Sequence, residues 1–163
     1  MAAYSGDGPA AEARFEDAFT EAQAKGDKVA LADALFGMAS LACAGGEGDR
    51  AASLHHEALA LRAKMGEAPA VTASLEAVAG LAVTAGRLEH AARLLGAAER
   101  ARAEQGYARA AGEAGAYESH VALLGQGLPL AELEAARAQG AQLSLEEGGG
   151  ARLQGPRPSR PAW

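Results

Sequence analysis

The sequence has very few cysteines. Cys43 is the only one, so an internal disulfide is excluded. Cys43 lies in the apolar run 38–44, and we predict that it is a buried structural thiol. A chain without disulfides fits a reducing compartment, and we expect a cytoplasmic location.

Long apolar runs and dense basic stretches are also missing. No run approaches the roughly 18 apolar residues of a membrane span, and the N-terminus lacks a basic region followed by an apolar core. We therefore expect neither membrane association nor export. The net charge of −6 and the scattered Lys and Arg residues would repel a phosphate backbone. Direct nucleic-acid binding is not expected.

Aromatic residues make up only 4 % of the chain, and alanine carries much of the apolar content. Strands favour β-branched and aromatic residues, whereas alanine is the best helix former. The composition therefore predicts an all-α fold.

Motifs for catalysis or metal binding are absent as well. His55 and His56 are adjacent, so on a helix they point about 100° apart and cannot clamp one metal ion. We predict that His55 lies in a helix contact and His56 on a solvated face. His90 and His120 have no acidic or cysteine partner at ligand spacing, which favours surface roles. We predict no catalytic, cofactor or metal site; an enzyme would require His90, His120 and carboxylates to converge in one cleft.

What the sequence does contain is an internal repeat. Two glycine columns recur every 40 residues: Gly6, Gly46, Gly86 and Gly26, Gly66, Gly106. A period of this length is typical of solenoids. Glycine favours turns and ends helices, so each unit divides into two helices. The sequence therefore predicts stacked helical hairpins.

The turns and apolar stripes predict helices at 9–25, 28–44, 49–65, 69–85 and 88–105, with Asp49 as an N-cap. We expect a repeat domain over 1–147, made of a half-repeat 1–26, repeats 27–66 and 67–106, and a degenerate repeat 107–147. Residues 148–163, rich in glycine and proline, are predicted to be a disordered tail.

The degenerate repeat is expected to keep the register of the others. Ala122 would continue the Ala42 and Ala82 column, and Ala131 and Ala138 would keep the register of the second helix. Gly112 and Gly115 each cost about 1 kcal/mol in a helix interior, so the first helix of this repeat should start late or fray.

The spacing of small and large residues favours one repeat family. The second unit offers Leu75, Ala79, Ala82, Gly86, Ala91, Leu95 and Ala98. These intervals resemble the tetratricopeptide pattern, although its usual period is about 34 residues. We predict a right-handed α-solenoid of about three and a half repeats; HEAT-type repeats, of about 40 residues, are the structural alternative.

A sharper resemblance lies in the C-terminal half, in the run Ala91-Ala92-Arg93-Leu94-Leu95-Gly96-Ala97-Ala98-Glu99 with Tyr117-Glu118 and the segment 143–147. It resembles the end of the tetratricopeptide segment in actinobacterial LuxR-type and related signal-transduction ATPase regulators. Where those proteins often carry a tryptophan, this chain has Arg137. Their phosphate loop and helix-turn-helix are missing. The resemblance implies a fragment or truncated relative of a transcriptional regulator.

Two candidate binding regions follow from the solenoid prediction. A concave groove would carry Asp33, Phe36, Ser40 and Glu76 from the first helix of each hairpin, unless Phe36 is simply core. An N-terminal edge would expose Phe15 and Phe19, inviting self-association.

The predicted role is a non-catalytic protein-interaction or regulatory sensor module that binds a protein or peptide. The alternative is a small-molecule effector-binding domain, which would need a closed pocket.

Overall fold

The computed structural model describes residues 8–106, 108–109 and 111–143 of the 163-residue chain. Within these residues the fold is all-helical and contains no strand. The predicted tail 148–163 lies outside the described residues. The helices are α1 Gly8–Lys25, α2 Lys28–Ala44, α3 Gly48–Met65, α4 Ala68–Thr84, α5 Leu88–Gln105, α6 Ala111–Gly127 and α7 Leu130–Ala141.

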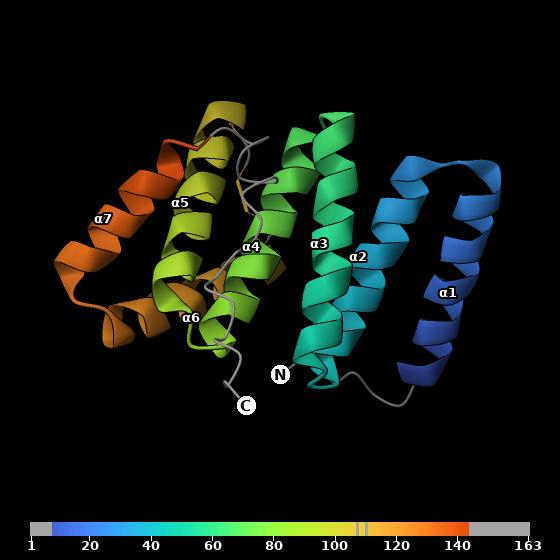
Figure 1. Cartoon of the computed structure of the whole chain (residues 1–163), viewed down its shortest axis with the longest axis horizontal. Coiled ribbons are helices and arrows are strands. Elements are labelled where there is room, and N and C mark those ends of the chain that lie inside the picture. Colours follow the sequence, from blue (N-terminus) through green and yellow to red (C-terminus); the bar gives the residue numbers. More distant parts are fainter. Residues whose placement is uncertain (1–7, 107, 110, 144–163) are drawn as a thin grey trace, which may run out of the picture.

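Helices that follow one another in the sequence pack side by side from α1 to α5. Figure 1 shows them crossing the molecule in this order, with α7 against α5 at the far end. The turns between them are short, so successive helices run in opposite directions. The sixth helix contacts α4, α5 and α7 more sparsely. The chain therefore builds a row of helical hairpins whose last member differs from the rest.

The turns are set by glycine. In the described residues every positive-φ residue is a glycine, and these recur every 20 residues: Gly26, Gly46, Gly66, Gly86 and Gly106. Gly66, with φ of 71°, ends α3 in the left-handed conformation, which other residues adopt only at a cost. The two glycine columns of the sequence are thus one structural column.

Helix starts follow side-chain caps less regularly. Asp27 accepts the backbone N–H groups of Val29 and Ala30 and so caps α2. Asp49, predicted as the cap of α3, instead lies in the first turn of that helix, because the helix begins one residue earlier at Gly48. Its charge there still complements the positive end of the helix dipole.

The core is built from columns of alanine and leucine. Leu35 and Leu75 are fully buried one repeat apart, as are Ala39 and Ala79. Alanine columns allow helix axes to approach closely, and the leucines fill the space between hairpins. The 40-residue period therefore corresponds to a repeated packing unit over α2 to α5.

The last hairpin leaves this register. Helices α4 and α5 each begin 40 residues after α2 and α3, but α6 begins 43 residues after α4, and α7 begins 42 after α5. The predicted columns are therefore wrong here: Ala122, Ala131 and Ala138 are exposed. Leu124, Leu133, Ala136 and Gly140 are buried in their place. Helix α6 begins at Ala111, ahead of both Gly112 and Gly115, so these glycines lie inside the helix and do not delay its start.

Helix α7 packs on α5 through two glycines. A Cβ on Gly96 would lie closer than 3.0 Å to the carbonyl oxygen of Arg137, and one on Gly140 would overlap the carbonyl oxygen of Arg93. The two backbones therefore touch directly, which only glycine permits. This reciprocal contact adds to the packing of Leu133 and Ala136 of α7 in the apolar core.

Cys43 is exposed, so the prediction of a buried thiol is wrong. The buried stripe of α2 runs through Leu35, Ala39 and Ala42, and Cys43 lies beside it near the helix end. Burial of part of the residue nevertheless raises the pKa of its thiol. Among the described residues, no helix is long and apolar enough to cross a membrane.

Candidate functional site: a pocket over three helices

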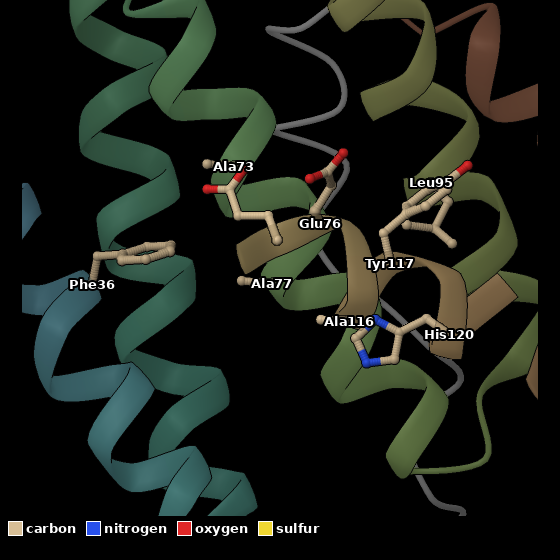
Figure 2. Close-up of a pocket in the computed structure, with 9 residues that line it drawn as sticks. Phe36, Ala73, Glu76, Ala77, Leu95, Ala116, Tyr117 and His120 are labelled. Atoms are coloured by element: carbon tan, nitrogen blue, oxygen red, sulfur yellow. The ribbon is translucent and has the colours of Figure 1, made fainter. Parts of the chain in front are cut away.

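A pocket of about 270 Å³ lies over α4, between α2 and α6. Figure 2 shows Phe36 of α2 on one side and Tyr117 and His120 of α6 on the other. The remaining lining residues are Ala73, Glu76, Ala77, Leu95, Glu113 and Ala116. The first helices of three successive hairpins thus supply alanines and ring walls, and Leu95 of α5 also lines the pocket.

The His120 ring is held in place by a glycine. A Cβ on Gly80 of α4 would overlap the His120 ring, so the imidazole packs directly on the α4 backbone. Burial lowers the pKa of His120 below its ordinary value. His120 is therefore neutral at pH 7 and serves as a flat, weakly polar wall.

Glu76 forms the polar centre of the site. Its carboxylate accepts hydrogen bonds from Arg102 at 2.8 Å for both oxygens, and from Arg109 at 2.8 and 3.0 Å. Burial would raise its pKa, but the hydrogen bonds from the two arginines outweigh burial and lower it. Glu76 is thus ionised and fully engaged, which makes it a poor general base.

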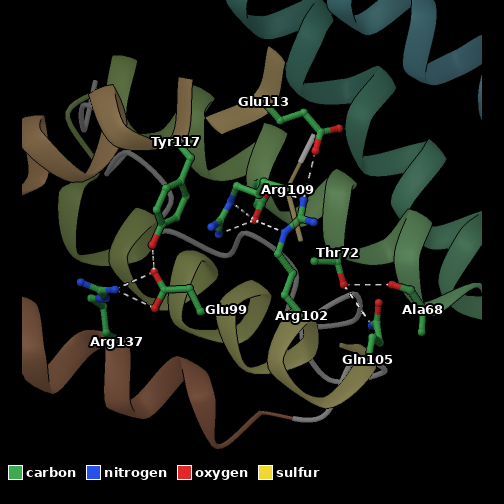
Figure 3. Close-up of polar contacts among 10 residues, drawn as sticks. Ala68, Thr72, Glu99, Arg102, Gln105, Arg109, Glu113, Tyr117 and Arg137 are labelled. Carbon is green, nitrogen blue, oxygen red and sulfur yellow. Dashed lines mark hydrogen bonds and ion pairs between the residues drawn. The ribbon is translucent and has the colours of Figure 1, made fainter. Parts of the chain in front are cut away.

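The polar contacts continue from Glu76 to α7, as Figure 3 shows. The Arg109 guanidinium stacks 3.3 Å from the centroid of the Tyr117 ring. The Tyr117 hydroxyl donates to Glu99, which also binds Arg137 of α7 at 2.6 and 2.7 Å. Tyr117, a wall of the pocket, is therefore tied to both α4 and α7.

Another arginine, Arg62, lies on the Phe36 side of the pocket. Arg62 of α3 donates to Ser74 of α4 at 2.8 Å and pairs with Asp33 of α2 at 2.7 Å. Its guanidinium also lies 4.6 Å from the centroid of the Phe36 ring. Arg62 therefore joins three helices and fixes the ring that walls the pocket.

Arg62 and Arg102 were missed as structural residues by the sequence reasoning. They are 40 residues apart, in the same column of the repeat, and that coincidence was a usable signal. Each reaches a carboxylate on the preceding helix and a polar group on the following one. An arginine in this column is thus part of the repeat.

His55 lies in a helix contact, as predicted, whereas His56 and His90 are less exposed than expected. His55 is 2 % exposed and packs edge-on against Phe36, with ring centroids 4.9 Å apart. Burial, with smaller effects from His56 and Arg62, lowers the pKa of His55 to about 4. The Nε2 atoms of His56 and His90 are buried, so neither ring is freely solvated, in contrast to the expectation for both residues.

The predicted groove residues divide into two groups. Phe36 and Glu76 line the pocket, and Asp33 lies one turn before Phe36 on α2. Ser40 is exposed and donates to the Phe36 carbonyl oxygen, away from the lining. His120 and Tyr117 were not predicted, because α6 lies out of register; Ala73 and Ala77 of the in-register α4 were not predicted either.

The predicted association edge is partly covered. The Phe15 ring packs against Gly37 of α2, where a Cβ would overlap it, and Phe19 is also partly buried. Self-association through these residues stays a prediction.

Catalytic and metal chemistry finds little support in the geometry. His120 shares the pocket with Glu76 and Glu113, but His90 is not among the lining residues. Within the described part of the chain, no group of three or more His, Cys, Asp or Glu residues could hold a metal ion.

Comparisons with known proteins give no family. No protein-family model, no curated protein and no solved structure matches this chain.

Proposed function

We propose that this chain is a tetratricopeptide-like α-solenoid that acts as a protein-interaction module with no catalysis of its own. The observation that carries the proposal is a pocket lined mainly by α2, α4 and α6, the first helices of successive hairpins, with Leu95 of α5. A peptide laid across these helices would contact several hairpins at once. Stacked repeats commonly use such a shared surface for binding.

Three further features support this proposal. The exact 40-residue recurrence of α2 and α3 in α4 and α5 is the arrangement of a repeat array. Of the two carboxylates that line the pocket, Glu76 is the less exposed; it is occupied by two arginines and is unsuited to proton transfer. The resemblance of the C-terminal half to bacterial signal-transduction regulators makes a regulatory, cytoplasmic role the natural setting for such a module.

The test is peptide selection from a random displayed library. Ala77→Leu would fill the pocket floor, and Ala60→Leu adds the same bulk at an exposed position of α3. Peptides that bind the parent and Ala60→Leu but lose at least tenfold affinity for Ala77→Leu would support the proposal. A library that yields no peptide sensitive to Ala77→Leu would overturn it.

The alternative is a small-molecule effector domain, favoured by the concave shape of the pocket and by its neutral His120. Ligand pockets usually measure about 300–1,000 Å³, so the pocket of about 270 Å³ is near the lower limit. A metabolite that raises the melting temperature of the parent and Ala60→Leu, but not of Ala77→Leu, would establish this alternative.

A further inference from the structure

Two of the ion pairs beside the pocket share one orientation. The Arg62 side chain is 7 % exposed while its partner Asp33 is 63 % exposed. Arg102 is 13 % exposed and its partner Glu113 is 51 % exposed. In each pair the arginine is the less exposed partner and the carboxylate faces water, so the carboxylate is the charged group that an approaching ligand reaches first.

One carboxylate lines the pocket and the other lies near it on the opposite side, where it pairs with the arginine beside the Phe36 ring. Asp33 lies one turn before the Phe36 wall on α2, and Glu113 itself lines the pocket one turn before Tyr117 on α6. The third carboxylate, Glu76, is neutralised by two arginines. Asp33 and Glu113 each bind an arginine through one oxygen, Oδ1 and Oε2, and because both side chains are exposed the other oxygen can accept from a group bound at the mouth.

The interior favours a flat apolar group. Three rings, Phe36, Tyr117 and His120, form the walls, and alanines form the floor. Aromatic side chains pack well in offset or edge-to-face contact with other rings. About 270 Å³ accommodates one large side chain rather than a folded element.

We propose that the pocket binds an extended peptide segment by one aromatic side chain, with Lys or Arg residues on either side of it reaching Glu113 and Asp33. This inference rests on the proposed function and specifies the chemistry of the partner. The aromatic anchor supplies most of the affinity, because it is the part removed from water. The basic residues select the partner and accelerate binding, because the carboxylates at the mouth stay solvated.

The test uses defined fluorescent peptides instead of a library. One has a central tryptophan flanked by lysines; the second has the same tryptophan flanked by glutamates; the third replaces the tryptophan by alanine between lysines. At low salt the lysine–tryptophan peptide should bind at least tenfold more tightly than either of the others. Its advantage over the glutamate peptide should shrink as salt rises.

Variants assign the binding to the proposed groups. Ala77→Leu should abolish binding of the lysine–tryptophan peptide, whereas Ala60→Leu should leave it unchanged. Glu113→Gln should reduce the preference for lysine over glutamate several-fold, and the control Glu57→Gln, at an exposed position of α3, should not. Circular dichroism confirms that each variant remains folded.

The outcomes separate this inference from the function it depends on. Peptides from the random library that are sensitive to Ala77→Leu but are acidic or lack aromatic residues would overturn the inference and keep the interaction module. Equal binding of the lysine–tryptophan and lysine–alanine peptides would show nonspecific charge attraction and overturn it too. A dimer that becomes monomeric in Ala77→Leu, with no peptide bound, would make a second copy the occupant and overturn it.

Discussion

Arg62 and Arg102 occupy the same column of the repeat, yet their surroundings differ. Arg62 pairs with the exposed Asp33 and with the neutral hydroxyl of Ser74. Arg102 shares the buried Glu76 with Arg109 and also reaches Glu113. The first arrangement joins two regular hairpins, and the second joins a regular hairpin to the shifted α6.

The difference shows how one repeated residue serves two purposes. Where the hairpins are in register, alanine and leucine packing holds the helices and the arginine adds a bridge. Around α6, the helix contacts are sparse, and charged and aromatic groups hold the pocket wall. Helices α6 and α7 also bury Leu124, Leu133 and Ala136 in the apolar core, so the C-terminal part should depend on its polar contacts and glycines in addition to apolar packing.

The largest effect should come from Gly140→Val, which breaks the C-terminal part and spares the rest. Its side chain would meet the Arg93 carbonyl oxygen, so α7 must leave α5. We expect a loss of about 3 kcal/mol or more in the free energy of unfolding, as for severe overpacking. Urea denaturation measures this, and retention of parent stability would contradict the backbone contact.

Removal of the Glu76 carboxylate should destabilise the protein more than removal of the Asp33 carboxylate. Glu76→Ala leaves Arg109 and part of Arg102 buried without their partner, and should cost about 3 kcal/mol. Asp33→Ala removes an exposed partner and should cost less than about 1 kcal/mol. Equal losses in urea denaturation would refute the contrast between the two arginines.

Acid should destabilise the N-terminal part through His55. Its folded pKa of about 4 lies below the ordinary value of 6.5, so the unfolded chain binds a proton first as pH falls. The contribution of His55 to the free energy of unfolding is fully present above about pH 6.5. It is lost progressively as the pH falls toward 4, by up to about 3 kcal/mol.

The measurement is the free energy of unfolding of the parent and His55→Leu between pH 7 and 4. The variant should lose a large part of the slope, while the remainder comes from His56, His90 and His120, whose pKa values are also lowered. Protonation of Glu76, whose pKa is lowered in the folded protein, decreases the free energy of unfolding further only below about pH 4.5. An unchanged slope in His55→Leu would exclude His55 as its origin.

The smallest effect should come from Gly115→Ala. This substitution also serves as a control for Gly140→Val, because it adds a side chain to a helical glycine that has no close neighbour. Gly115 lies within α6, and a Cβ there meets nothing within 4 Å. The substitution should stabilise the protein by about 0.5–1 kcal/mol, because alanine favours helices. Thermal unfolding would show a small rise in melting temperature; a fall would indicate a neighbour that the structure does not show.

Local signals predicted much of the fold. Glycine at 20-residue intervals and the alanine and leucine stripes located the helices from α1 to α5, because turn geometry and amphipathic period are local properties. They also predicted that Phe36 and Glu76 would share a face. The register of α6 and α7 was mispredicted, because a shift of two or three residues carries no penalty until α7 docks on α5.

The sequence by itself determined an all-helical chain with a 40-residue period, because helix propensity and glycine turns act over a few residues. Only the tertiary structure decided which helical glycines contact another backbone. Gly96 and Gly115 both lie inside helices, but only Gly96 packs against a neighbouring backbone, that of Arg137. It also determined which residues line the pocket. Phe36 is distant in sequence from Tyr117 and His120, and they line one pocket only when α6 packs beside α4.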